Sequence, residues 1–150
     1  MKRAFTLIEL IFVIVLLGIL GAVALTKLNA TREDAIAAKK AKLLTTAINE
    51  IASNAIGQDN LTNGLEAYSN VLSEMVNRGE VVKNGSDNNL TLLTGSNHRC
   101  VTLALVNVNR EQKLDVTYES PGGDAVCSGL QKILHNSDYS LVLKKQMVRY

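Results

Sequence analysis

The sequence predicts an α+β fold in which one long N-terminal helix packs against a small antiparallel β-sheet. Three observations lead to this prediction. An apolar run occupies residues 5–25, a 3.6-residue apolar period continues through residues 36–55, and alternating apolar segments with turn residues between them follow over residues 81–148. With 150 residues, the chain is long enough for one globular domain and short for two.

The composition excludes several classes of protein. Hydrophobic residues make up 47% of the chain and charged residues 20%, which is unlike a disordered segment. The formal net charge of +2 argues against a protein built around a large basic surface for nucleic acid. With 4% aromatic residues and a single Pro, the chain is neither a base-stacking platform nor a proline-rich ligand.

The apolar run of residues 5–25 predicts a membrane-spanning helix. At 1.5 Å per residue it is about 30 Å long, which matches the hydrocarbon core of a bilayer. Lys2 and Arg3 precede the run, which favours a cytoplasmic N-terminus. A plain signal anchor fits this pattern, and so does a cleaved signal peptide with an A-x-A site at residues 22–24. A buried core helix fits poorly because the run is apolar on all sides.

Glu9 is an acidic residue inside this apolar run. A carboxylate there costs on the order of 2–3 kcal/mol unless it reaches water at the membrane edge or meets a partner. The helix itself offers no cation at matching spacing. We therefore expect either an interfacial glutamate or a glutamate that pairs with another subunit.

The segment KRAFTLIE at residues 2–9, followed by the apolar run, resembles the leader and N-terminal helix of type IV pilins and type II secretion pseudopilins. The resemblance covers roughly the first thirty residues. It implies that a prepilin peptidase cuts between Ala4 and Phe5 and methylates the new amine of Phe5. It also implies that Glu9 pairs with the N-terminal amine of a neighbouring subunit during filament assembly.

The resemblance also implies a division of the chain. Residues 1–4 would be the leader peptide, residues 5–26 the transmembrane and polymerisation helix, and residues 27–150 a periplasmic pilin-like globular domain. Two features depart from the family pattern: Ala4 replaces the usual Gly before the cut, and the only Pro is Pro121. The helix kink associated with a proline in many members is therefore not expected on that basis.

The helical pattern continues beyond the membrane edge. Apolar residues recur on one face through residues 36–55. Lys39, Lys42 and Glu50 lie off that face and are predicted to contact solvent. A Gly-containing polar stretch then ends the pattern, so one helix of about 75–80 Å is expected over residues 5–56.

The remainder of the chain predicts a second helix and a sheet. Residues 65–77 form an amphipathic helix candidate, with Leu65, Tyr68, Leu72, Met75 and Val76 directed inward. The short connections predict an antiparallel meander with one face on the long helix. The expected strands span residues 81–82, 90–94, 100–108, 114–118 and 141–148.

Cys100 and Cys127 are the only cysteines, and both lie in the part of the chain predicted to be outside the membrane. In a periplasmic setting we expect them to form a structural disulfide. The bridge would close a segment of about 28 residues and stabilise the fold by about 3–4 kcal/mol. A redox pair is the alternative, but it needs closer C-x-x-C spacing.

No catalytic, cofactor or metal site is expected. His98 and His135 have no Cys or carboxylate at ligand spacing. The sequence has no nucleophile elbow, P-loop or dinucleotide-binding glycine motif. The segment 84–89 is rich in oxygen ligands but lacks spaced carboxylates, so a hairpin loop is expected there.

Two weaker signals point to modification or binding. Asn89 begins an N-x-T sequon and follows Asp87 by two residues, which resembles the extended acceptor of bacterial N-glycosylation. Lys144, Lys145 and Arg149 form a small basic group that could contact DNA phosphates. The simpler interpretation is that these lysines blunt an edge strand.

The predicted function is structural and not enzymatic. The resemblance implies a pseudopilin or minor pilin of a type II secretion pseudopilus or type IV pilus. Its partners would be copies of itself, other pilins or pseudopilins, prepilin peptidase and an inner-membrane assembly platform. It would cross the bacterial inner membrane once, with a periplasmic head, before joining a filament. A DNA- or substrate-binding competence pilus subunit and a secreted periplasmic protein with an ordinary signal peptide are the alternatives.

Overall fold

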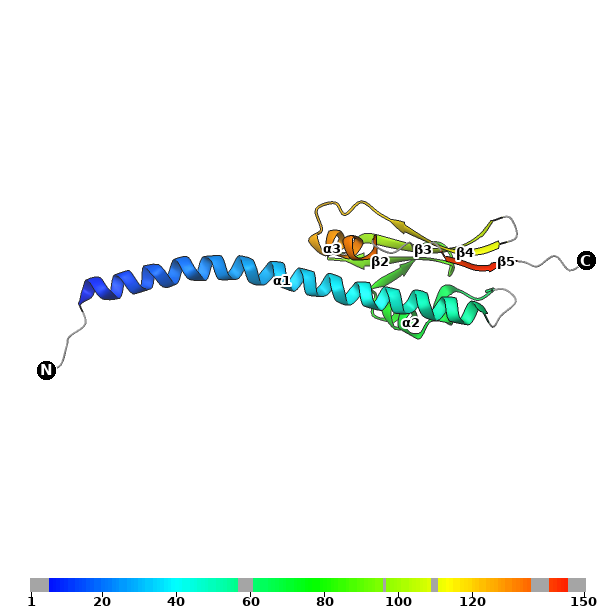
Figure 1. Ribbon diagram of the computed structural model, residues 1–150, viewed down its shortest axis with the longest axis horizontal. Coiled ribbons are helices and arrows are strands. Elements are labelled where there is room, and N and C mark those ends of the chain that lie inside the picture. The colour runs from blue at the N-terminus through cyan, green and yellow to red at the C-terminus, as the bar shows by residue number, and fades with distance from the viewer. Residues whose placement is uncertain (1–5, 57–60, 96, 109–110, 136–140, 146–150) are drawn as a thin grey trace, which may run out of the picture.

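The computed structural model describes residues 6–56, 61–95, 97–108, 111–135 and 141–145. One long helix, α1 (Leu7–Ile56), carries a head along its C-terminal half, and its N-terminal half projects alone (Figure 1). This is the predicted α+β architecture. The head consists of η1 (Leu65–Tyr68), α2 (Asn70–Asn77), β1 (Val81–Lys83), β2 (Asn89–Thr94), β3 (His98–Val108), β4 (Glu111–Tyr118), α3 (Ala125–Leu134) and β5 (Leu141–Lys145).

Helix α1 ends at Ile56, as its sequence pattern predicts. The predicted start at Phe5 lies outside the described residues, and the described helix begins at Leu7. Its 50 residues correspond to about 75 Å. Gly18 and Gly21 do not interrupt it, so the two halves of α1 form one continuous element.

The C-terminal half of α1 supplies one side of the core. Leu44, Ile48 and Ile51 are fully buried because a spacing of four and three residues places them on one helix face. Lys39 and Lys42 are exposed on other sides, as predicted. These buried residues therefore form a single apolar face of α1.

Glu50 is half-buried, so the prediction that it contacts solvent holds only in part. Its Oε2 accepts a hydrogen bond of 2.6 Å from Ser69 Oγ and a longer one of 3.4 Å from the backbone N–H of Val71. Ser69 Oγ in turn accepts from the backbone N–H of Leu72 at 3.0 Å, as the N-cap of α2. Glu50 thus holds the start of α2 against α1, where exposed helix amides favour an anion.

The helix predicted over residues 65–77 is divided in two. Ser69 has an extended backbone (φ −144°), which ends η1 and allows its side chain to cap α2. Four of the five residues predicted to point inward are buried, and Val76 is half-buried against the core. The predicted inward positions are therefore confirmed, although the helix is interrupted at Ser69.

The sheet confirms the predicted antiparallel meander. Its strand order is β1-β2-β3-β4-β5, with each strand antiparallel to the next. Leu103 in β3 pairs with Leu90 on one side and Val116 on the other, so apolar residues form a row on the face toward α1. β3 and β4 begin earlier than predicted, at His98 and Glu111, because polar residues extend the ladder beyond the apolar segments.

Helix α3, between β4 and β5, was not predicted. The link expected here to be short contains ten helical residues instead. Asp124 caps the helix by accepting from the backbone N–H of Cys127 at 2.9 Å. At Gly129 an added Cβ would lie 3.1 Å from the Cβ of Ala37, so the glycine allows α3 to lie close against α1.

The turn from α2 to β1 positions a charged residue beside α1. Gly79 adopts φ +72°, and its backbone N–H donates to the carbonyl of Val76 at 2.9 Å. The backbone N–H of Glu80 donates to the carbonyl of Met75 at 2.9 Å. These two bonds form a Schellman cap, whose left-handed residue is favourable for glycine. The cap turns the chain so that Glu80 faces α1.

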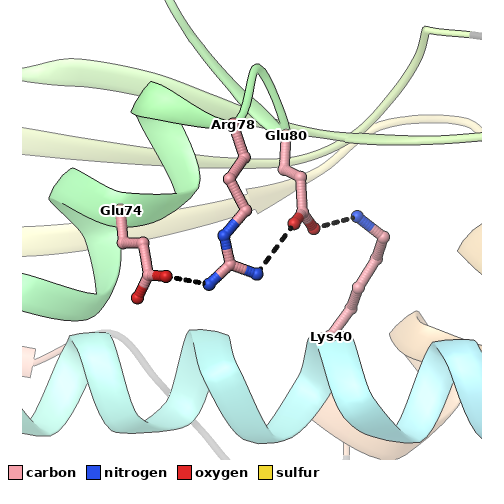
Figure 2. A network of polar contacts seen from close by, with 4 residues as sticks. All are labelled: Lys40, Glu74, Arg78 and Glu80. Carbon is pink, nitrogen blue, oxygen red and sulfur yellow. Dashed lines mark hydrogen bonds and ion pairs between the residues drawn. The ribbon is translucent and has the colours of Figure 1, made fainter.

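Glu80 joins the head to α1 through an ion-pair network (Figure 2). Its Oε2 lies 2.8 Å from Lys40 Nζ, and its Oε1 lies 3.6 Å from a guanidinium nitrogen of Arg78, which also contacts Glu74. The hydrogen bond from Lys40 lowers the pKa of Glu80 below its ordinary value, against the opposing effect of burial. The carboxylate is therefore ionised at neutral pH.

Candidate functional site

Thr6 and Glu9 cap the N-terminus of α1. The Glu9 carboxylate accepts from the backbone N–H of Thr6 at 2.9 Å and from its hydroxyl at 2.7 Å. The backbone N–H of Glu9 donates to the Thr6 hydroxyl oxygen at 3.4 Å. This reciprocal arrangement is a capping box, in which the first helical residues gain partners for their free amides.

The capping box changes the interpretation of Glu9. The sequence has no cation at matching spacing in the same helix, which predicts a partner in another subunit or contact with water. Within a single chain, Thr6 supplies neutral donors instead. The T-x-x-E spacing was a readable signal for this contact. Ala4 and Phe5, the predicted cleavage residues, lie outside the described residues.

The N-terminal half of α1 is apolar and exposed on all sides. Every residue between 7 and 24 is exposed, and the large hydrophobic side chains among them range from 43% exposed at Val13 and Leu16 to 77% at Leu7. α1 contains a stretch long and apolar enough to cross a membrane, and none of it is buried within the subunit. Such a surface is unfavourable in water, so lipid or other protein chains must cover it.

The structure contains the predicted disulfide between Cys100 and Cys127. Both residues are fully buried, their Cα atoms are 5.6 Å apart, and the bond joins β3 to α3. Gln131 reinforces the junction, because its Nε2 donates to the carbonyl of Cys100 at 3.1 Å and to that of Glu119 at 2.6 Å. The cysteines therefore hold α3 on the sheet.

Asn89 lies at the first position of β2 and not in an open loop. Its Oδ1 accepts from Asn84 Nδ2 at 3.3 Å. The sequon threonine, Thr91, is fully buried, with its hydroxyl 2.7 Å from that of Thr102. An enzyme that recognises the sequon must reach the side chains of both Asn89 and Thr91. The sequon is therefore inaccessible to such an enzyme once the head has folded.

The other predicted residues do not gather into a site. His98 Nε2 lies 2.8 Å from the carbonyl of Ser120, and the His135 ring stacks on Tyr118 with centroids 4.6 Å apart. Residues 84–88 form the connection between β1 and β2, as expected for a hairpin loop, and Asn89 begins β2. Among the described residues, no group of three His, Cys, Asp or Glu side chains could hold a metal ion.

The basic C-terminal group is only partly described. The backbones of Lys144 and Lys145 lie in β5, the edge strand of the sheet. Arg149 and the side chains of both lysines are outside the described part of the chain. The edge position fits the simpler interpretation of these residues.

Comparison with known proteins identifies the N-terminal segment. Residues 1–25 match the family described as the prokaryotic N-terminal methylation motif. No curated protein and no solved structure matched the chain. The matched residues include the capping box and most of the exposed apolar run, and the motif supports a pilin-like or pseudopilin subunit in general. The chain thus carries the prepilin-type signature of type IV pilins and pseudopilins.

Proposed function

We propose that the chain is a pseudopilin or minor pilin, a structural subunit of a type II secretion pseudopilus or type IV pilus. The observation that carries this proposal is the continuity of α1. An apolar half, exposed on all sides, runs without interruption into the half that forms the core of the head. An ordinary signal peptidase would cut after Ala24, in the middle of this helix, so continuity supports retention of the apolar half.

The proposal includes processing by prepilin peptidase. The enzyme removes residues 1–4 by cutting between Ala4 and Phe5, and it methylates the new amine of Phe5. The removed leader contains Lys2 and Arg3, so 14 basic residues remain beside 14 acidic ones. The net positive charge of the whole chain then belongs to the orientation signal and not to the mature subunit.

The proposed mechanism begins in the inner membrane, with residues 5–26 spanning the bilayer and residues 27–150 in the periplasm. An ATP-driven platform extracts the subunit, and the apolar helices exchange lipid for one another in the filament. Glu9 then leaves or shares its Thr6 donors and pairs with the methylated Phe5 amine of a neighbouring copy. A carboxylate that keeps a partner throughout avoids the penalty of an unpaired buried charge.

Mass analysis of the mature N-terminus tests this proposal. We expect a start at methylated Phe5 in cells with prepilin peptidase and an intact leader in cells without it. The Ala4→Gly variant, which has the family's usual residue, should give the same product. A mature protein that starts at Leu25 would show an ordinary signal peptide and would overturn the proposal.

The alternative function is a DNA- or substrate-binding competence pilus subunit. The closeness of Lys144, Lys145 and Arg149 in the sequence is the observation that favours it. If this alternative is correct, neutralising both lysines together with Arg149 abolishes DNA binding while filaments still assemble. DNA binding that is unchanged in this variant would exclude the alternative and leave only the structural role.

A glycan on Asn89 is a separate proposal. Because Thr91 is buried in the folded head, the transfer would have to precede folding. A mass shift on the peptide that bears Asn89, lost in Asn89→Gln, would support it. An unmodified peptide in cells with an active N-glycosylation system would exclude it.

A further inference from the structure

The chain contains two Asn-Gly dipeptides, Asn63-Gly64 and Asn84-Gly85. An asparagine before a glycine is especially prone to spontaneous deamidation, because glycine has no side chain to keep its backbone nitrogen from the amide carbon. Both dipeptides lie in connections of the head: the first precedes η1, and the second joins β1 to β2. The two can therefore be compared within one folded chain.

The backbones of the two asparagines are held alike. The backbone N–H of Asn63 donates to the Tyr68 hydroxyl oxygen at 3.1 Å, and that of Asn84 donates to the carbonyl of Asn89 at 2.8 Å. Within the described part of the chain, neither following glycine uses its backbone N–H in a hydrogen bond. The backbone hydrogen bonds therefore do not distinguish the two sites.

The side chains of the two asparagines are held differently. Nδ2 of Asn84 donates to Asn89 Oδ1 at 3.3 Å and also to the Thr91 hydroxyl, and Asn84 is half-buried. Asn63 is exposed, and its side chain forms no hydrogen bond with any other described residue. Deamidation requires the amide to turn toward the next backbone nitrogen. Asn84 must break two hydrogen bonds to do so, and Asn63 none.

We propose that Asn63 deamidates spontaneously in the folded head and that Asn84 is protected from the same reaction. The backbone nitrogen of Gly64 loses its proton and bonds to Cγ of Asn63. The bond from Cγ to Nδ2 breaks, and Nδ2 takes up a proton and leaves as ammonia, which closes a succinimide ring. Water then opens the ring at either carbonyl and leaves aspartate or isoaspartate, with no change in oxidation state. The inference concerns the head alone and does not depend on the proposed function.

The isoaspartate product does not fit the segment that holds Asn63. Its main chain contains an additional methylene group before Gly64. The segment is fixed on both sides of this point, by the contact of Asn63 with Tyr68 and by a hydrogen bond of 2.9 Å from the backbone N–H of Leu65 to the carbonyl of Asp87. A Cβ added at Gly64 would lie 2.4 Å from that of Asp87, so there is no room for displacement. We therefore expect isoaspartate to break the contact between Leu65 and Asp87.

Mass analysis of peptides from the full-length chain, stored in detergent at mildly alkaline pH, tests the proposal. Deamidation at position 63 should be about tenfold faster than at position 84, because each hydrogen bond of the Asn84 amide slows the reaction severalfold. In the chain unfolded by urea, the two sites should react at similar rates. Equal rates in the folded chain, or a difference that persists in urea, would overturn the proposal.

Two variants separate the causes. Thr91→Ala removes one acceptor of the Asn84 amide, so it should speed deamidation at position 84 about threefold or more and leave position 63 unchanged. An unchanged rate at position 84 would overturn the protection of Asn84 by its hydrogen bonds.

Asn63→Asp adds the charge of the product without the additional methylene group. Hydrogen exchange of the Leu65 amide should be about fivefold faster in the isoaspartate form than in the unmodified chain, because the bond to Asp87 is lost. Asn63→Asp should leave this exchange unchanged. Equal exchange in the isoaspartate form and the unmodified chain would overturn the expected effect on the backbone, and so would equally fast exchange in Asn63→Asp.

Discussion

Glu80 provides the sharpest test of how the head is held on α1. The Glu80→Gln substitution keeps the size of the side chain and removes its charge. Lys40 then loses an ionised partner that lies 2.8 Å away, at a site where the two side chains are only 14% and 27% exposed. The contact spans forty residues of sequence, so its loss reports on tertiary structure and not on local helix stability.

The expected cost follows from this geometry. A hydrogen bond to a charged group contributes about 1.5–3 kcal/mol when it is well buried, and exposed ion pairs contribute about 1 kcal/mol or less. Glu80 lies between these limits, and glutamine retains a neutral acceptor. We therefore expect Glu80→Gln to lower the free energy of unfolding by about 1–2 kcal/mol at neutral pH.

Its pH dependence has a defined sign. The pKa of Glu80 is lowered in the folded state by the hydrogen bond from Lys40. The stabilisation is therefore complete above the unfolded pKa of about 4.3 and is lost as the pH falls through the lower, folded-state pKa. The difference in the free energy of unfolding between wild type and Glu80→Gln should therefore disappear as the pH falls through this range.

Urea unfolding of the full-length chain in detergent, monitored by circular dichroism, measures this difference in the free energy of unfolding. Glu74 provides the control, because it contacts Arg78 at the outer end of the same network with a side chain that is 65% exposed. Glu74→Gln should cost about 0.5 kcal/mol or less. Equal costs for the two variants, or a cost of Glu80→Gln that is unchanged at about pH 3, would contradict a stabilising ion pair between Glu80 and Lys40.

Two further predictions concern the other junctions of the head. Under oxidising conditions, Cys127→Ser should lower the free energy of unfolding by about 3–4 kcal/mol. Under reducing conditions, in which the wild-type disulfide is also broken, the two proteins should have nearly the same free energy of unfolding. Glu50→Gln should lower the free energy of unfolding by about 1–2 kcal/mol, because Ser69 loses a charged acceptor. Glu33→Gln, at an exposed position of α1, should leave it unchanged. Equal effects of the two variants would show that Glu50 does not hold α2.

The sequence could predict α1 because its signals are periodic and long. A membrane-length apolar run and an apolar face at 3.6-residue spacing exist before any tertiary contact forms. The strands of the meander were predictable for the same reason, through alternation and turn residues. Glu50 was not, since a charged residue off the apolar face predicts solvent contact. Only the folded position of Ser69 makes it a capping partner.

Helix α3 was missed because its local signals are weak. It has ten residues, and Ser128 and Gly129 in its middle both lower helix propensity. Its stability comes from neighbours that are distant in sequence: the bridge to Cys100, the hydrogen bonds of Gln131 and the close packing on Ala37. Asp124, three residues before the bridged cysteine, was the one local sign of a helix start.

The continuity of α1 connects Glu9 to the head. Because no proline or break separates Glu9 from the half of α1 that packs in the core, a displacement set at the N-terminus is carried along the helix to the head. A helix that kinked or melted between them would shift and rotate the head while Glu9 kept its partner. The position of the head in the proposed filament therefore depends on whether α1 remains one helix when the subunit leaves the membrane.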